Sequence, residues 1–533
     1  MEHYGWLSLI PPFLAIGLAF ITRQVLPSLF VSIWIGATII YGGNIVAGFM
    51  HTIEKYIAGS IADPWNAAIL VINIVLGGTI GIISKTGGMK AVADALARKA
   101  RTPRSGQFVT FIMGCLIFFD DYANTLLVGN TMRPLTDRLN ISREKLSFLC
   151  DSTAAPVASM ALISTWTAYE MGVIRIAFQT IGLDMNIYEA FLRSVPFRFY
   201  SITMLFFVFF VIIMNRDYGP MLKAERRART SHKLYAPGST PLASKELTDM
   251  KIKKGIPLRW YNAAIPISVI VVMIMAGLYY DGWTQIMNSE DTGLISLVRT
   301  SPVSLLAIGE ILGASRVDTA LMWAVFTGTI TIMALALFQR ILRIGEIMDA
   351  WVDGAKSMVI ALLIIVMAWA IGNLCRDLGT ATFLVGILAG KISPILIPPS
   401  VFGIGCIIAF STGTAYGTVA ILMPIAVPLA YQLGGGEVGG LLFSTMGATF
   451  TGAVFGDHCS PISDTTILSS MATASDHLDH VKTQMPYAVT VAFIAIITGF
   501  IPAAAGLNPV ISILLGAASS ALVLGIFGKR VDS

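Results

Sequence analysis

The sequence is poor in charged residues. Only 13% of its 533 residues are Asp, Glu, Lys or Arg, about half of the roughly 25% that is usual in soluble globular proteins. Hydrophobic residues make up 55% of the chain. This composition excludes a soluble globular protein and predicts an all-α polytopic membrane protein in the inner (plasma) membrane. The net charge of +5 fits basic cytoplasmic loops and gives no reason to expect a nucleic acid partner.

Cysteine is scarce as well, with five residues in the whole chain. The number is odd and all five lie in apolar segments, so we expect buried free thiols rather than disulfides. The first residues lack the basic stretch of a cleavable signal peptide, and the apolar run 7–21 is therefore expected to remain as the first helix.

Long polar segments are almost absent. The one long polar insert, residues 216–260, is rich in Lys and Arg and should therefore be cytoplasmic. It divides the chain near its middle. The predicted organisation is 1–64 as N-terminal scaffold helices, 65–215 as a first repeat, 216–260 as a basic linker, 261–483 as a second repeat and 484–533 as C-terminal helices.

The two halves share landmarks in the same order. Ile80-Gly81 matches Ile371-Gly372, Pro134 matches Pro424, and the segment 150–156 matches 455–461. Several ordered matches indicate an internal repeat. The run 65–84 leads into basic residues, whereas 356–375 follows them, so the two copies are expected to be antiparallel, as in inverted-repeat transporters.

The run 107–131 has basic residues on both flanks. A single crossing cannot have both ends on the cytoplasmic side, so we predict a re-entrant hairpin with its polar tip at 120–125. By symmetry, the run 402–430 should be an opposed hairpin with its tip at 411–414. This interpretation gives about 11 transmembrane helices and two hairpins.

The strongest motif is Gly-Asp-His-Cys-Ser-Pro-Ile-Ser-Asp-Thr-Thr, at 456–466, inside the apolar run 438–471. An ionisable group at membrane depth costs about 2.5–3.5 kcal/mol, so such groups usually face a cavity or an ion path. Pro461 removes a backbone donor and interrupts the helix, which frees carbonyl oxygens beside the two carboxylates. Broken helices with oxygen ligands are typical of the ion sites of secondary transporters.

The predicted ion-binding residues form two sets of mostly hard oxygen ligands. The first set joins the first tip to the break at 151–156, and the second joins the second tip to the break at 457–464. The sets are Asp120, Asp121, Asn124, Thr125, Asp151, Ser152 and Thr153, and Ser411, Thr412, Thr414, Asp457, His458, Ser460, Ser463 and Asp464.

Such ligands suit a sodium-sized cation better than a transition metal. The neighbours Asp120 and Asp121 cannot both stay ionised at low cost, so one is expected to hold a proton. Competition between a proton and a cation for one carboxylate is a minimal mechanism of antiport.

Other interpretations of these residues are open. Asp120 or Asp121 could cap a half-helix, and Asp457 and Asp464 could form structural pairs with backbone amides. His458 is either a proton carrier or a hydrogen-bonded structural residue.

Three other features carry ionisable residues. The Asp-His-Cys triplet could suggest zinc, but zinc needs three or four convergent ligands, and His477 and His480 are expected in a cytoplasmic loop. Glu170 is either a second proton site or a residue at the outer interface. Glu310 is equally open.

The segments 118–124, 150–156 and 456–466 resemble those of NhaC-type sodium/proton antiporters of the ion transporter superfamily. The resemblance extends over about residues 10–525. It implies a homodimer with a scaffold domain, a mobile transport domain with two opposed hairpins, and elevator-type exchange of Na⁺ for H⁺. It implies transported ions rather than a cofactor. The ion-binding role then falls on Asp120, Asp121, Asn124, Asp151, Ser152, Ser411, Thr412, Thr414, Asp457 and Asp464.

The resemblance leaves the substrate open, because some relatives exchange malate and lactate with sodium and protons. No Arg or Lys lies in the tips or the breaks, and the nearest, Arg133 and Arg175, are expected at the membrane interface. This favours bare cations over an organic acid. An intramembrane hydrolase is the alternative of another class, but no spaced nucleophile–base pair supports an enzyme.

Overall fold

The computed structural model describes residues 4–22, 24–97, 100–118, 121–161, 164–241, 256–356, 358–380, 383 and 393–532. Apart from two short strands, the regular elements in these ranges are helices. Seven of the described helices are long and apolar enough to cross a membrane, or up to nine if each of two bent pairs forms one span. The polytopic all-α class is confirmed, whereas the count of about 11 crossings stays a prediction.

The helix α5 (Pro64–Lys85) shows how the ends of a spanning helix are fixed. Asp63 caps its start by accepting a hydrogen bond from the Asn66 amide, and Pro64 occupies the first turn, where its missing N–H costs nothing. The helix packs against α19 (Val317–Phe338) and α20 (Ile344–Lys356). A Cβ on Gly81 would lie 2.2 Å from the Ala350 carbonyl oxygen, so this close approach requires glycine.

The first predicted hairpin is formed by α7 (Pro103–Leu116) and α8 (Asp121–Arg138). It is longer than the predicted 107–131, because Thr102 and Ser105 form a capping box that starts α7 earlier. The predicted break follows. α9 (Arg143–Asp151) ends there, and α10 (Ala155–Ala158) and α11 (Thr165–Ile181) continue the chain.

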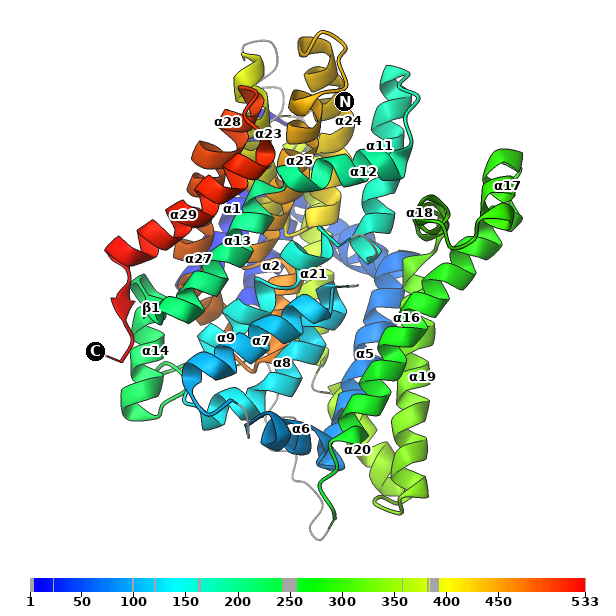
Figure 1. The fold of residues 1–533 in the computed structure, drawn as a ribbon. Coiled ribbons are helices and arrows are strands. Elements are labelled where there is room, and N and C mark those ends of the chain that lie inside the picture. Colours follow the sequence, from blue (N-terminus) through cyan, green and yellow to red (C-terminus); the bar gives the residue numbers. More distant parts are fainter. Residues whose placement is uncertain are drawn as a thin grey trace.

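The second hairpin is formed by α23 (Ile397–Thr412) and α24 (Ala415–Leu433). Its turn requires Gly413, whose φ of +70° lies in the left-handed region. The second break separates α25 (Gly440–Cys459) from α26 (Asp464–Ala472). In Figure 1 the first hairpin lies in the lower half of the molecule and the second in the upper half, so the two approach from opposite ends. The repeat symmetry itself stays a prediction.

The remaining helices surround these two hairpins and breaks (Figure 1). They are α1 (Ile10–Thr22), α2 (Val25–Ile40), α3 (Ile45–His51), α4 (Gly59–Ala62), α6 (Gly88–Ala97), α12 (Ile187–Ser194), α13 (Phe199–Met214), α14 (Gly219–Ser231), α16 (Tyr261–Met287), α17 (Thr292–Thr300), α18 (Leu305–Ala314), α21 (Val359–Asp377), α27 (His477–Ile494), α28 (Ile501–Ala504) and α29 (Pro509–Phe527).

The first part of the polar insert is packed into the fold. In it, β1 (Arg216–Asp217) pairs antiparallel with β2 (Lys529–Arg530) near the C-terminus. Glu225 in α14 is buried and accepts hydrogen bonds of 2.8 Å from both the amide and the hydroxyl of Ser142. Burial raises the pKa of Glu225, against the opposing charge of Lys145. This part of the predicted linker therefore ties the two halves together.

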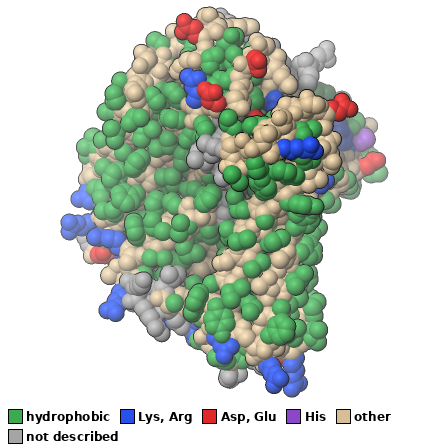
Figure 2. Space-filling view, turned by 45° about the vertical axis from the view of Figure 1, so that its right-hand side comes forward, with side chains coloured by type: hydrophobic (Ala, Val, Ile, Leu, Met, Phe, Trp, Pro, Cys, Tyr) green, Lys and Arg blue, Asp and Glu red, His purple; other side chains and the backbone are tan. Residues whose placement is uncertain are grey.

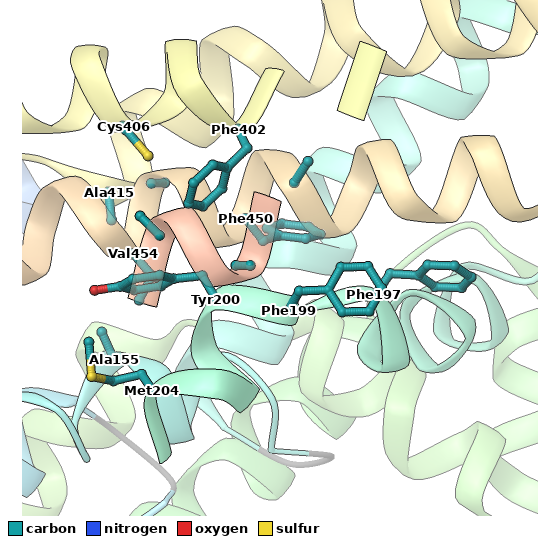
Figure 3. Packing of buried hydrophobic residues seen from close by; sticks show 14 of the residues in the cluster. Ala155, Phe197, Phe199, Tyr200, Met204, Phe402, Cys406, Ala415, Phe450 and Val454 are labelled. Atoms are coloured by element: carbon teal, nitrogen blue, oxygen red, sulfur yellow. The ribbon is translucent and has the colours of Figure 1, made fainter. Parts of the chain in front are cut away.

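Two large hydrophobic clusters form the core. One lies around α5, α16, α19 and α21, and the other around α13 and α23 to α25. Figure 3 shows part of the second cluster, in which the rings of Tyr200 and Phe402 lie with their centroids 6.0 Å apart. On the surface in Figure 2, hydrophobic side chains cover much of the visible face, and Lys and Arg lie mainly along its left edge and lower end, with a few near the top. This distribution agrees with a basic cytoplasmic side at the bottom.

Candidate ion-binding cavity

The two hairpin tips and the second break line one cavity of about 690 Å³. The cavity opens to the surface at one end, and three buried carboxylates lie at the other. The exposed end is marked by Lys55, Asp63 and Asp377, and the buried end by Asp121, Asp457 and Asp464.

Asp121 is the first residue of α8, and its side chain is only 3% exposed. Its Oδ2 accepts a hydrogen bond of 2.9 Å from Trp166 Nε1. The side chain therefore has a fixed position at the tip of the first hairpin. Asp120, the other member of the predicted pair, lies outside the described residues.

Asp457 and Asp464 come from the two sides of the second break. The hydroxyl of Ser463, which also caps α26, donates a hydrogen bond to Asp457. Asp464 accepts a hydrogen bond of 2.6 Å from the Tyr122 hydroxyl and one of 2.8 Å from the Thr465 amide. The predicted pairing of Asp464 with a backbone amide is thus present, and the same carboxylate also lines the cavity.

Asn124 joins the first tip to the first break. Its amide nitrogen donates to the carbonyl oxygens of Gly114, Ile117 and Thr153, at 2.6, 2.8 and 2.9 Å. Its Oδ1 is buried and has no hydrogen-bond partner among the described residues. Buried acceptors are rarely left without a partner, but Asn124 itself does not line the cavity.

Asp151, predicted to share a site with Asp121, lies elsewhere. Its carboxylate accepts a hydrogen bond of 2.6 Å from Gln484 Nε2 and one of 3.2 Å from the Ser469 hydroxyl. It does not line the cavity. Asp121, from the first predicted set, thus lines the cavity together with Asp457 and Asp464 of the second set, whereas Asp151 does not.

His458 is held at both ring nitrogens. Nε2 lies 3.0 Å from the Ser152 hydroxyl, and Nδ1 lies 2.8 Å from the Tyr200 hydroxyl. These contacts favour the structural role over the proton carrier. His477 and His480 were predicted in a cytoplasmic loop, and this is wrong: both are buried in α27, where Ser470 lies between their Nδ1 atoms at 3.0 and 2.9 Å.

Most of the predicted hydroxyl ligands bond to nearby backbone. Thr412 and Thr414 line the cavity, and Thr414 also caps α24 through the Gly417 amide at 3.2 Å. Ser460 joins the second break to the second hairpin through the Phe410 carbonyl at 2.7 Å. Hydroxyls bonded to a carbonyl of their own helix or hairpin are those of Thr125, Thr153, Ser411 and Thr412.

The sequence did not indicate several of the residues that line the cavity. Lys55 and Arg376 line the cavity, so the prediction that Arg133 and Arg175 are the nearest basic residues is wrong. Lys55 Nζ lies 2.6 Å from Asp377 Oδ2. Their spacing in the sequence gives no signal, because they come from segments more than 300 residues apart.

The two undecided glutamates form ion pairs. Glu170 is fully buried and accepts hydrogen bonds of 2.6 and 2.7 Å from the two terminal nitrogens of Arg198. The interpretation that it lies at the outer interface is therefore wrong. Glu310 pairs with Arg175 at 3.3 Å. All five cysteines are free. In the described ranges, no group of three or more His, Cys, Asp or Glu side chains could hold a metal ion.

Comparison with known proteins decides the family. Residues 157–501 match the Na⁺/H⁺ antiporter family. The chain belongs to the Na⁺/H⁺ antiporter family. An uncharacterized protein of Haemophilus influenzae is 31% identical over 490 residues, 91% of this chain and 88% of that protein. This antiporter-family chain is thus a multi-pass integral membrane protein and a secondary transporter.

Two partial relatives have informative names. The Na⁺/H⁺ antiporter NhaC of Alkalihalophilus pseudofirmus is 27% identical over 29% of this chain and 32% of its own length. The malate-2H⁺/Na⁺-lactate antiporter of Bacillus subtilis is 32% identical over 29% of this antiporter and 33% of its own length. The YdaH transporter structure from Alcanivorax borkumensis aligns with 90% of this chain and 89% of its own, at a TM-score of 0.36 and 14% identity.

Proposed function

We propose that this protein exchanges Na⁺ for H⁺ across the membrane at the cavity carboxylates. The observation that carries the proposal is that Asp121, Asp457 and Asp464, from both halves of the chain, line one cavity. Three carboxylates in a partly desolvated space cannot all stay ionised at low cost without a cation, so protons and sodium would compete for them.

Neutral oxygens complete the proposed site. The hydroxyls of Thr412 and Thr414, which line the cavity, suit a hard monovalent cation. The unpartnered Oδ1 of Asn124, outside the cavity lining, remains a predicted ligand. Asp151, Ser152, Thr153 and His458 would hold the two breaks in place, and Asp120 remains a predicted ligand.

The cavity opens at the ends of α5 and α21 where Asp63 and Asp377 lie, opposite the basic end of α5 at Lys85. By the distribution of basic residues this is the outer side, so we infer that the structure represents an outward-open state. Inward release would need the hairpins and breaks to move against the scaffold, and we propose an elevator-type movement in a homodimer.

A second candidate is the coupled exchange of a small organic solute. The cavity of about 690 Å³ is far larger than one sodium ion needs, since a water molecule takes up about 30 Å³. Arg376 could hold an organic carboxylate at its outer end, as the name of the partial relative from Bacillus subtilis would suggest.

Proteoliposomes containing the full chain and a pH-sensitive dye test the first candidate. A sodium pulse outside is expected to move protons from the liposome lumen, with organic solutes absent. Asp121→Asn should abolish this response, whereas Asp353→Asn, on the surface of α20 and 49% exposed, should leave it intact. Absence of sodium-driven proton movement in the wild type, or its appearance only with malate, would overturn the proposal of bare-cation exchange.

A further inference from the structure

The cavity wall is unusually aromatic. Seven of its 27 lining residues are Phe, Trp or Tyr, against 10% of the whole chain. Sodium itself needs oxygen ligands and not ring faces, so the exchange of Na⁺ and H⁺ leaves this enrichment unexplained. The seven are Tyr56, Trp65, Tyr122, Trp166, Tyr169, Trp369 and Tyr416.

The aromatic residues form a continuous wall around Tyr416. The ring of Tyr169 stacks on Tyr416 with centroids 4.2 Å apart. Trp166 meets Tyr416 edge-on at 4.9 Å, and Trp65 lies at 6.3 Å. These residues come from three helices, α5, α11 and α24. The wall is therefore a product of the tertiary fold and not a stripe along one helix.

The same wall is joined to the carboxylates. Trp166 donates to Asp121 at 2.9 Å, and Tyr122 donates to Asp464 at 2.6 Å. Aromatic side chains and carboxylates thus lie next to each other in one cavity. Carboxylates together with aromatic rings are the combination that binds an organic cation, through ion pairing and cation–π attraction.

The balance of charge selects the sign of the solute. The lining contains five Asp residues and two basic residues. One of the two, Lys55, is already paired with Asp377 at 2.6 Å. A dianion such as malate would face an excess of negative charge at the buried end, whereas a cation would relieve it.

We propose that the cavity binds an organic solute with an ammonium or guanidinium group, seated between the aromatic wall and the carboxylates Asp121 and Asp464. This inference deepens the proposed function and rests on it, since the same carboxylates bind sodium and protons. The solute then competes with sodium for the buried end of the cavity, and its carbon skeleton fills the space that a bare ion leaves to water.

Equilibrium binding tests the proposal directly. Radiolabelled agmatine, which carries one ammonium and one guanidinium group, is titrated onto the purified full chain in detergent, and labelled malate is titrated in parallel. Saturable agmatine binding that weakens as Na⁺ is raised is expected. Binding of malate without agmatine, or of neither, would overturn the inference.

Variants at Trp65 test the aromatic wall. Trp65→Leu should weaken agmatine binding about tenfold, the size of a lost cation–π contact in a desolvated site, and Trp65→Phe should restore most of it. Trp323→Leu is the control, because Trp323 lies in α19 outside the cavity and should have no effect. Equal agmatine affinity in Trp65→Leu and wild type, or an equal loss in Trp323→Leu, would overturn the role of the wall.

The two proposals fail separately. Sodium-driven proton flux is measured on the same preparation without any organic solute. Flux without agmatine binding would remove the organic cation and leave the proposed exchange. Agmatine binding without flux would do the reverse: it would support the organic cation site and reject exchange of the bare ions.

Discussion

Asp151 and Asp457 lie one position apart in the aligned segments 150–156 and 455–461 of the two predicted repeats, and their surroundings differ. Asp457 lines the open cavity, together with Asp121 and Asp464. Asp151 is enclosed by Gln484, Ser469 and Thr466, which donate hydrogen bonds of 2.6, 3.2 and 3.4 Å to its two oxygens. Both carboxylates accept hydrogen bonds from protein donors, Asp457 from Ser463 and Asp151 from three side chains, but only Asp457 also lines the cavity.

The difference separates two tasks. A carboxylate that faces a cavity can exchange a proton or a cation without any change in the fold. A carboxylate whose oxygens are occupied by protein donors must first lose them. The two are linked, because the Thr466 hydroxyl lies 2.7 Å from the Asp457 carbonyl oxygen as well as 3.4 Å from Asp151. Asp151 would thus hold the break that positions Asp457.

The largest expected effect is that of Asp457→Asn. Removing one carboxylate from a desolvated cation site costs about 3 kcal/mol or more, so we expect at least about a hundredfold loss of sodium-driven proton flux. Flux into proteoliposomes measures it, with correct folding checked by the elution profile in detergent. Wild-type flux in this variant would remove Asp457 from the exchange and with it one side of the comparison.

A smaller loss is expected for Asp151→Asn. The asparagine oxygen can still accept from Gln484, and the Ser469 hydroxyl can turn to accept from the new amide, so the network stays satisfied. We expect flux within about tenfold of the wild type, because the lost charge assistance to these bonds is worth about 1.5 kcal/mol or less. If Asp151→Asn abolished flux while Asp457→Asn retained it, the two carboxylates would have exchanged roles.

Local features of this comparison could be predicted from the sequence. Pro156 and Pro461 follow carboxylates in apolar runs, and a helix ends shortly before each of them: α9 at Asp151 and α25 at Cys459. Basic residues on both flanks of the first hairpin predicted a chain that turns back, and α7 and α8 do so. These signals are local, because a missing N–H or a charged flank acts on its own segment.

The hydrogen-bond partners of these carboxylates could not be predicted, because they depend on how helices distant in the sequence pack. Tyr122 and Asp464 are 342 residues apart in the sequence, and Asp151 and Gln484 are 333 apart. Nothing in their spacing indicates which carboxylate each one reaches.

Tyr122→Phe sharpens the comparison on the cavity side. It removes the 2.6 Å hydrogen bond to Asp464 and keeps the ring in the wall. The lost bond is worth about 0.5–1.5 kcal/mol, so the sodium concentration for half-maximal flux should shift about threefold to tenfold, with the maximal flux retained. Sodium titrations of flux measure the shift. An unchanged sodium dependence would show that Asp464 does not contribute to cation binding.

Ser469→Ala tests the enclosed side and should have the smallest effect. Its hydroxyl donates a hydrogen bond of 3.2 Å to Asp151. The shorter hydrogen bond from Gln484 remains, so the carboxylate keeps a partner. We expect sodium dependence within about twofold of the wild type and a loss of about 1 kcal/mol in stability, seen as a lower thermal midpoint in detergent. If Ser469→Ala changes only the thermal stability and Tyr122→Phe changes only the sodium affinity, Asp151 holds the break in place and Asp464 binds the ion. A shift in sodium affinity from Ser469→Ala as large as that from Tyr122→Phe would mean that Asp151 takes part in binding, and that its enclosure opens during each exchange cycle.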